Sequence, residues 1–156
     1  MKYVDRVLQP GETVLHQAHL HWLIFLHAIG FVALAIAFLI AEQIYGNREP
    51  IVATVLVVVA CFFVFVAAET GFKAWIRRVT TEFAVTDRRV IYKTGLISRH
   101  TMEMNRSKVE SVDVRQSFFG RLFGYGTIVL RGTGATHEPI YHIADPLTFR
   151  SFITAG

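Results

Sequence analysis

Two long stretches without charged side chains constrain this chain more than any other feature of its sequence. Residues 22–41 contain no Asp, Glu, Lys or Arg, and neither do residues 50–68. At about 1.5 Å per residue, a helix over either stretch is about 28–30 Å long, which matches the hydrocarbon core of a bilayer. The pattern predicts transmembrane helices at residues 22–44 and 51–72, joined by an extracytoplasmic loop at residues 45–50.

Buried core helices of a soluble protein and a cleaved signal peptide are the alternatives for these stretches. The remainder of the chain after Ala68 is too short to cover two helices that are apolar on every side. The first stretch also exceeds the apolar part of a signal peptide, and a second stretch follows it. Cys61, in the middle of the second stretch, is the only cysteine, so it has no intramolecular disulfide partner, and packing is its expected role.

The distribution of positive charge predicts the orientation of this hairpin. Of the 16 Lys and Arg residues, only Arg48 lies in the loop, whereas Lys73, Arg77 and Arg78 come soon after the second stretch. Because cytoplasmic flanks carry the excess of Lys and Arg, we expect both termini in the cytoplasm and the chain in the inner (plasma) membrane. Residues 1–21 are then a cytoplasmic N-terminal segment.

Small and ionisable side chains within the first stretch allow more than one interpretation. Ala33, Ala37 and Ala41 recur on one helical face, which favours close helix contact either within the hairpin or in an oligomer. We favour the hairpin. His27 is the one readily ionisable side chain in the two stretches. It is either an intramembrane proton or metal site or a neutral histidine near the headgroups, and we favour the second interpretation.

Three short groups of residues resemble a metal site, a phosphate-binding loop and a catalytic triad, but each lacks a feature that such a site requires. Their residues are His16, His19 and His21; Gly132, Thr133 and Gly134; and Ser111, Asp113 and His100 or His142. The first group matches no zinc spacing, the second lacks the lysine and helix of a phosphate loop, and no nucleophile elbow surrounds the serine. We expect no metal, no cofactor and no enzyme activity. Dispersed basic residues also argue against nucleic-acid binding.

From Thr81 onward the hydrophobic pattern changes to the alternation of half-buried strands. Six strands are predicted, at residues 81–86, 89–93, 99–105, 109–116, 127–131 and 140–143. Val109 is out of phase with Val112 and Val114, which predicts a bulge or a late strand start.

Two helices accompany these strands. Ser117 is expected to cap a short helix with one apolar side, formed by Phe118, Phe119, Leu122 and Phe123. Asp145 and Pro146 are expected to start a final helix, whose buried side is formed by Leu147, Phe149, Phe152 and Ile153. Short antiparallel strands with one closing helix favour a small barrel or rolled sheet.

Two segments carry a resemblance to a known family. Residues 83–95 (FAVTDRRVIYKTG) and residues 112–127 (VDVRQSFFGRLFGYGT) resemble the bacterial pleckstrin-homology-like (PH-like) domain of YdbS-like membrane proteins. The resemblance implies a strongly bent antiparallel sheet or barrel of about seven strands, capped by a C-terminal helix, over residues 73–156. One strand beyond the six is expected within residues 95–105, or is missing. The family has no attributed catalytic residues.

Basic residues are the candidate binding groups. Residues 73–156 contain 13 Lys or Arg and 7 Asp or Glu, a net charge of +6. Lys73, Arg77 and Arg78 are expected at the headgroup level, where each cation gains about 1 kcal/mol near an anionic leaflet. Arg88 and Arg89 lie in a turn comparable to the lipid-binding hairpin of PH domains. Other cations extend this surface if the domain is suitably oriented: Lys93, Arg99, Arg106 and Lys108.

The sequence thus predicts a non-enzymatic, membrane-anchored bacterial interaction module. Its expected ligands are anionic lipid headgroups or a membrane-associated protein partner, and a homo-oligomer is plausible. The alternative is a small transport-related or envelope-stress subunit that acts through its transmembrane helices, for which His27, Glu42 and the alanine face are the support.

Overall fold

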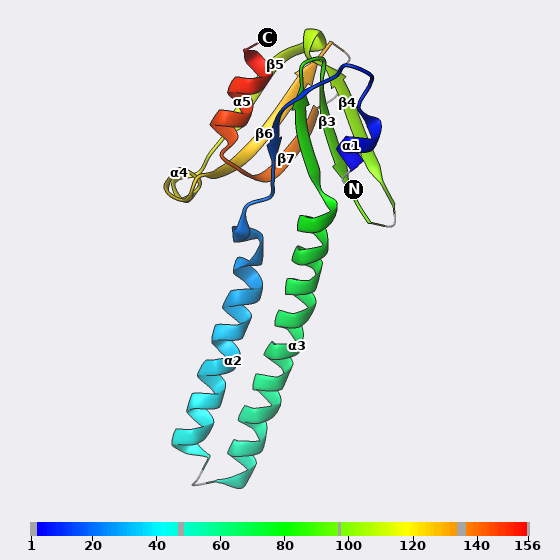
Figure 1. Ribbon diagram of the computed structural model, residues 1–156. Coiled ribbons are helices and arrows are strands. Elements are labelled where there is room, and N and C mark those ends of the chain that lie inside the picture. The colour runs from blue at the N-terminus through cyan, green and yellow to red at the C-terminus, as the bar shows by residue number, and fades with distance from the viewer. Residues whose placement is uncertain (1–2, 47–48, 97, 134–136, 156) are drawn as a thin grey trace. The chain divides into compact units, whose positions relative to one another are not determined.

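The computed structural model describes residues 3–46, 49–96, 98–133 and 137–155, and the chain forms two compact units (Figure 1). The hairpin unit is Trp22–Ile76, and the β unit combines Met1–His21 with Arg77–Gly156. Arg48 of the predicted loop and Gly134 of the glycine-rich loop lie outside the described residues.

The hairpin unit contains the two apolar helices. A 3-10 turn, η1 (Trp22–Phe25), leads into α2 (Leu26–Tyr45), and α3 (Pro50–Thr80) follows. The segments Trp22–Tyr45 and Pro50–Thr80 are long and apolar enough to cross a membrane, and few of their side chains are buried. Helix α3 continues past the predicted end at residue 72, so Lys73, Arg77 and Arg78 are all helical.

Small and aromatic residues pack α2 against α3. Ala35, Ala60 and Ala67 are buried, and the rings of Phe38 and Phe63 stack with centroids 5.5 Å apart. The alanine face predicted to make this contact is not the one used: Ala33 and Ala37 are exposed and Ala41 is half-buried. This corrects the prediction, because Ala35 lies two residues from Ala33 and therefore on a different side of the helix.

Among the described residues, the β unit contains seven strands in two antiparallel sheets, which replace the single bent sheet or closed barrel that was predicted. One sheet has the order β1-β2-β3-β4 and the other β5-β6-β7. The strands are β1 (Val14–Ala18), β2 (Glu82–Thr86), β3 (Arg89–Thr94), β4 (His100–Asn105), β5 (Val109–Arg115), β6 (Tyr125–Gly132) and β7 (His137–Ala144). The other elements are α1 (Tyr3–Val7), η2 (Arg106–Lys108), α4 (Phe118–Phe123) and α5 (Pro146–Thr154).

The seventh strand comes from the N-terminal segment and not from residues 95–105. Strand β1 precedes the apolar helices, yet it pairs antiparallel with β2, with Ala18 opposite Phe83 and Gln17 opposite Ala84. The segment 1–21 is therefore part of the β unit, and the hairpin is inserted between its first strand and its second.

Strand β2 is buried on both faces, although its alternating sequence predicted a half-buried strand. Phe83 contacts Phe149 of α5, with ring centroids 6.5 Å apart, on one face. On the other face Ala84 and Ile91 are covered by Val4 of α1. In Figure 1, α1 and α5 lie on opposite sides of the strands. The N-terminal helix therefore covers the face that would otherwise be solvated.

Local signals for caps and irregularities are confirmed. The Ser117 hydroxyl accepts a hydrogen bond from the Gly120 amide at 3.1 Å. Asp145 is the N-cap of α5, and Pro146 is the first residue of this helix. The β5–β6 register shifts between Val109 and Ser111, as the phase of Val109 predicted. The burial of Leu147 was predicted wrongly, since this side chain is 57% exposed whereas Phe149 is fully buried.

The burial of Phe149 generates a prediction. Phe149→Ala is expected to lower the free energy of unfolding of the β unit by about 3–5 kcal/mol, because it leaves a cavity between the sheets. Phe118→Ala makes the same chemical change at a side chain that is 78% exposed, and should have little effect. Thermal unfolding in mild detergent, followed by circular dichroism, compares the two. Equal losses would contradict the packing described.

Candidate functional site

The five predicted binding residues fall into two groups at opposite ends of strand β2. Lys73, Arg77 and Arg78 lie in the last turns of α3, directly before β2, whereas Arg88 and Arg89 follow β2 in the turn to β3. A five-residue strand is about 16 Å long. These cations therefore do not form one continuous basic surface.

The α3 group is exposed. Lys73 pairs with Glu69 one turn earlier and its side chain is 70% exposed. Arg77 and Arg78 are both exposed in the final turn, where the helix dipole favours positive charge. Arg78 also borders a small hollow of about 110 Å³ with His19 and Glu82. This group presents charge beside the end of an apolar helix.

Arg89 is committed to internal partners. Its Nε and Nη2 donate to the two carboxylate oxygens of Glu12 at 2.9 and 2.8 Å, and Nη1 donates to Glu103 at 2.6 Å. Nη2 also donates to the Val7 carbonyl at 2.7 Å. The Arg89 side chain is 12% exposed and that of Glu12 is fully buried. The guanidinium of Arg89 thus fastens the N-terminal segment to β3, and its ligand-binding role stays a prediction.

The same contacts keep Glu12 ionised. Hydrogen bonds from Arg89 lower the pKa of Glu12 from 4.5 to about 2, against the opposing effect of burial. The Gln9 amide and the Thr86 hydroxyl donate to this carboxylate as well, at 2.8 and 2.7 Å. Glu12 in turn raises the pKa of Arg89. A buried pair of this kind is destabilising to break, because either partner alone leaves an uncompensated charge.

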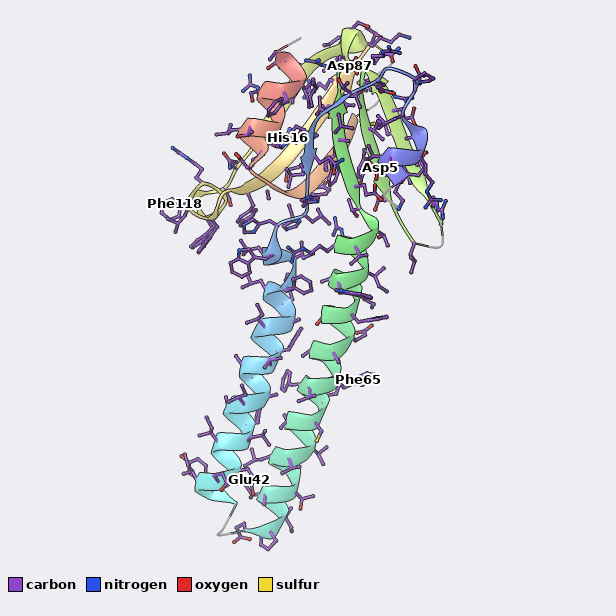
Figure 2. All side chains as sticks on the ribbon, viewed as in Figure 1. Asp5, His16, Glu42, Phe65, Asp87 and Phe118 are labelled. Atoms are coloured by element: carbon purple, nitrogen blue, oxygen red, sulfur yellow. The ribbon has the colours of Figure 1, made fainter. Side chains whose placement is uncertain are left out.

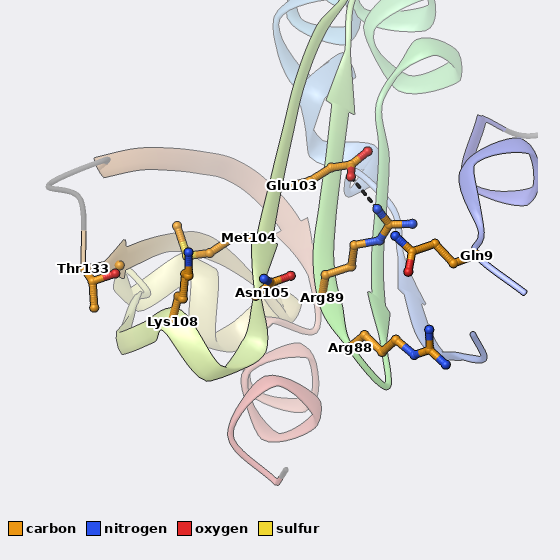
Figure 3. Close-up of a pocket in the computed structure, with 9 residues that line it drawn as sticks. Gln9, Arg88, Arg89, Glu103, Met104, Asn105, Lys108 and Thr133 are labelled. Carbon is orange, nitrogen blue, oxygen red and sulfur yellow. Dashed lines mark hydrogen bonds and ion pairs between the residues drawn. The ribbon is translucent and has the colours of Figure 1, made fainter. Parts of the chain in front are cut away.

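Arg88 lines a cleft of about 630 Å³ (Figure 3). Its side chain is 50% exposed, and its Nε lies 3.8 Å from Asp87. The cleft is bordered by the β2–β3 turn, the end of β4 with η2, and the end of β6; its residues are Gln9, Arg88, Arg89, Glu103, Met104, Asn105, Lys108, Gly132 and Thr133.

Arg88 and Lys108 supply the cleft's positive charge, because Arg89 and Glu103 are paired with each other. Gln9, Asn105 and Thr133 add amide and hydroxyl groups. Sequence reasoning missed these three, since they come from distant segments and carry no local motif. Cations with neutral donors suit a carboxylate or another anion and provide no nucleophile with a base.

The histidines singled out from the sequence have structural contacts. The His16 ring stacks on Phe152 at 4.7 Å, and the His21 ring on Tyr125 at 5.5 Å. Burial lowers the pKa of His21. His27 borders an open apolar hollow with Gly30 and Leu34. Within the described residues no group of three or more His, Cys, Asp or Glu is placed to hold a metal ion.

Two of the other predicted basic residues, Lys93 and Arg106, have partners within the β unit. Lys93 lies 3.8 Å from Glu82, and Arg106 donates to the carbonyls of Phe152 and Ile153 at the end of α5. Arg106 therefore joins η2 to α5. Asp113, weighed above as part of a triad, pairs with Arg131 at 3.1 Å.

Comparison with known proteins identifies one family. A family model described as "Bacterial PH domain" matches residues 22–155, which include both apolar helices. No curated protein and no solved structure matches the chain. PH-like domains are generally non-catalytic interaction modules, and no enzymatic family is indicated. The resemblance seen in residues 83–95 and 112–127 is thereby confirmed.

The Glu12–Arg89 pair generates a prediction on pH dependence. Because the pKa of Glu12 is lowered from 4.5 to about 2, its contribution to stability is complete above pH 4.5 and is lost as the pH falls toward 2. Glu12→Gln should cost about 3 kcal/mol of unfolding free energy at neutral pH and remove this part of the acid sensitivity.

Thermal unfolding between pH 2 and pH 7 measures both effects. Glu110→Gln, at an exposed position of β5, is the matched control and should retain the stability and acid profile of the unsubstituted chain. If Glu12→Gln and Glu110→Gln behave alike, Glu12 does not hold the N-terminal segment in place.

Proposed function

Because this chain belongs to the bacterial PH domain family, we propose that it is a non-enzymatic interaction module anchored in a bacterial membrane by α2 and α3. One observation carries the proposal. The β unit is assembled from residues before and after the hairpin, and the hairpin consists of two helices with the length and apolar composition of membrane spans. One polypeptide therefore combines a bacterial PH domain with an inserted hairpin of two helices that are long and apolar enough to cross a membrane.

Strand pairing supports the predicted topology independently of charge. Strands β1 and β2 are hydrogen-bonded to each other, so the segments that contain them lie on the same side of any bilayer that the hairpin crosses. Two spans satisfy this requirement, whereas an odd number does not. The excess of Lys and Arg outside the connection assigns that side to the cytoplasm.

The cations of α3 are proposed to contact anionic lipid headgroups. Arg77 and Arg78 are exposed in the last turn of a helix whose preceding residues are apolar, so anchoring brings them to the headgroup level. Lys73 lies one turn earlier and has the stem length to extend toward the same level. This contact confines the β unit to the membrane surface and raises its effective concentration for partners there.

The cleft of Arg88 and Lys108 is proposed to take an acidic group of a membrane-associated protein. Arg88 and Lys108 are exposed there beside neutral amide and hydroxyl groups, an arrangement that suits a carboxylate of a partner. The transport-related alternative remains an untested prediction. His27, its main support, borders only an open apolar hollow.

Cysteine labelling tests the anchored topology. In a Cys61→Ala background, Glu49→Cys lies between α2 and α3, whereas Asp5→Cys and Ser107→Cys lie on exposed parts of the β unit. A membrane-impermeant maleimide applied to spheroplasts should label Glu49→Cys alone. Inverted membrane vesicles should give the reverse pattern. Labelling of all three positions from one side would refute a two-span anchor.

Energy transfer from the two tryptophans to fluorescent lipids tests headgroup binding by the full chain. Arg77→Gln with Arg78→Gln should reduce the preference for phosphatidylglycerol over phosphatidylcholine. At about 1 kcal/mol, or a factor of about five, for each cation, the reduction is measurable and should shrink with added salt. Glutamine is chosen because a charge reversal would also disturb insertion.

Arg88→Gln with Lys108→Gln is the matched control for this measurement. It removes the same charge from the cleft, at the other end of β2, and should leave the lipid preference unchanged. If substitution of Arg77 and Arg78 leaves the preference for phosphatidylglycerol unchanged, these residues do not bind lipid headgroups, and only the protein-partner proposal remains.

A further inference from the structure

Helix α4 exposes a concentrated apolar surface. Four of its six residues are large and apolar, and their exposed fractions are 78% for Phe118, 60% for Phe119, 66% for Leu122 and 46% for Phe123. Figure 2 shows Phe118 projecting away from the strands. The sequence predicted an apolar side here, but no element of the β unit covers it within the described residues. Clustered exposed apolar groups usually mark a surface that meets another phase or molecule.

The exposure of α4 belongs to a well-defined helix. The helix is closed at its start by Ser117, and at its end by Gly124, which has a positive φ of 73° and donates its amide to the Gly120 carbonyl. Gln116 donates to the Tyr125 carbonyl at 3.1 Å across the base of the helix. A Cβ on Gly120 would lie 2.7 Å from that same carbonyl oxygen, so only glycine permits this close approach. The helix is therefore held to the β unit by hydrogen bonds at its base, while its large apolar side chains are exposed.

The base of α4 lies at the point where the chain enters the hairpin. The His21 ring stacks on Tyr125 at 5.5 Å, and His21 is hydrogen-bonded to the backbone of Phe123. The His21 amide also donates to the His142 carbonyl at 2.7 Å. Trp22 is the next residue in the chain and the first of the predicted span, and consecutive Cα atoms are about 3.8 Å apart.

The end of α3, where the chain re-enters the β unit, lies near the same connection. Arg78, in the last turn of α3, lines one small hollow together with His19, two residues before His21, so the second connection to the hairpin lies near the first. All of these contacts lie within the β unit and do not depend on where the hairpin unit sits. The chain therefore leaves the β unit after His21 and returns to it at Arg77, and the first of these two connections lies beside the base of α4.

The charges around α4 suit an anionic bilayer. From Val114 to Arg131 the chain has no Asp or Glu, while Arg115 and Arg121 flank and interrupt the apolar side chains. Aromatic and aliphatic side chains with interspersed cations are typical of helices that lie in the membrane interface.

We propose that α4 inserts its apolar side chains into the headgroup–acyl boundary of the leaflet that adjoins the β unit. This proposal rests on the proposed function, because it requires the hairpin to span that membrane. Lipid is the occupant rather than a second copy of the chain, since connectivity brings lipid to His21 in every molecule at any protein concentration. The β unit is then held by its two connections and by α4.

Spin labelling of the full chain in phosphatidylglycerol–phosphatidylcholine vesicles tests this proposal. Leu122→Cys and, as the control, Ser107→Cys are labelled separately in a Cys61→Ala background; both positions are exposed and distant from the core. Collision rates with oxygen and with a water-soluble nickel chelate report depth. The label at position 122 should lie about 5–10 Å within the boundary, and the label at position 107 should remain in water.

The unsubstituted chain, labelled at Cys61 of α3, separates the two ways of failing. If the Cys61 label is in lipid while the label at position 122 is in water, α4 is not a membrane element and the anchored module stands. Shielding of position 122 from both reagents, with spin–spin broadening, would show that a second copy covers α4 and overturn the lipid assignment. If the Cys61 label is in water, both proposals fail.

Discussion

The β unit of this protein cannot be completed without residues from both sides of its apolar hairpin. Strand β1 supplies one edge of the four-stranded sheet, and Glu12 supplies the buried carboxylate that Arg89 requires on β3. Both come from the chain before α2, while their partners come after α3. The hairpin is consequently an insertion whose two ends are held together by the fold. This constraint explains how a short N-terminal segment, rich in polar residues, remains ordered. Glu82 accepts hydrogen bonds from the backbone amides of Tyr3 and Val4 at 3.0 and 3.2 Å, and Asp87 accepts one from the Thr13 amide at 2.9 Å.

Two adjacent arginines show how the fold assigns different roles to one residue type. Arg88 lies in the turn and keeps half of its side chain in water, whereas Arg89 is the first residue of β3 and extends across the outer face toward Glu12. Four of the five guanidinium N–H groups of Arg89 have internal acceptors, so little donor capacity is left for an incoming anion, and release of Arg89 would leave the buried carboxylate of Glu12 unpaired. The acidic ligand proposed for the cleft would therefore be bound through its other two cations, Arg88 and Lys108. The sequence presents the pair as equivalent, and only the position of Glu12 separates them.

Local patterns predicted the elements well and the surfaces that cover them poorly. The apolar helices, the six later strands, the Ser117 and Asp145 caps and the irregularity at Val109 follow from interactions between near neighbours, which a sequence displays directly. Strand β1 was missed because its mixed residues, including His16 and Gln17, become a strand only by pairing with β2 beyond the hairpin. The polar stripe of β2 resembled a solvated face, but Thr86 and Glu82 bind the N-terminal segment instead. The same limit applies to Ala33 and to α4, since a periodic face does not reveal which surface, if any, it meets.

With the hairpin in a membrane, as proposed, the two chain connections and α4 would together limit how freely the β unit moves. Two connections alone, at His21 and at Arg77, define an axis about which a domain can still tilt. A third contact would reduce this freedom, and the exposed side chains of α4 would provide one if they insert as proposed. Restricting tilt reduces the orientational entropy that a partner must otherwise overcome on binding. Arg88 and the end of α3 lie at opposite ends of β2, so the proposed lipid contact and the proposed cleft involve different residues of one small domain, and substitutions can separate the two roles.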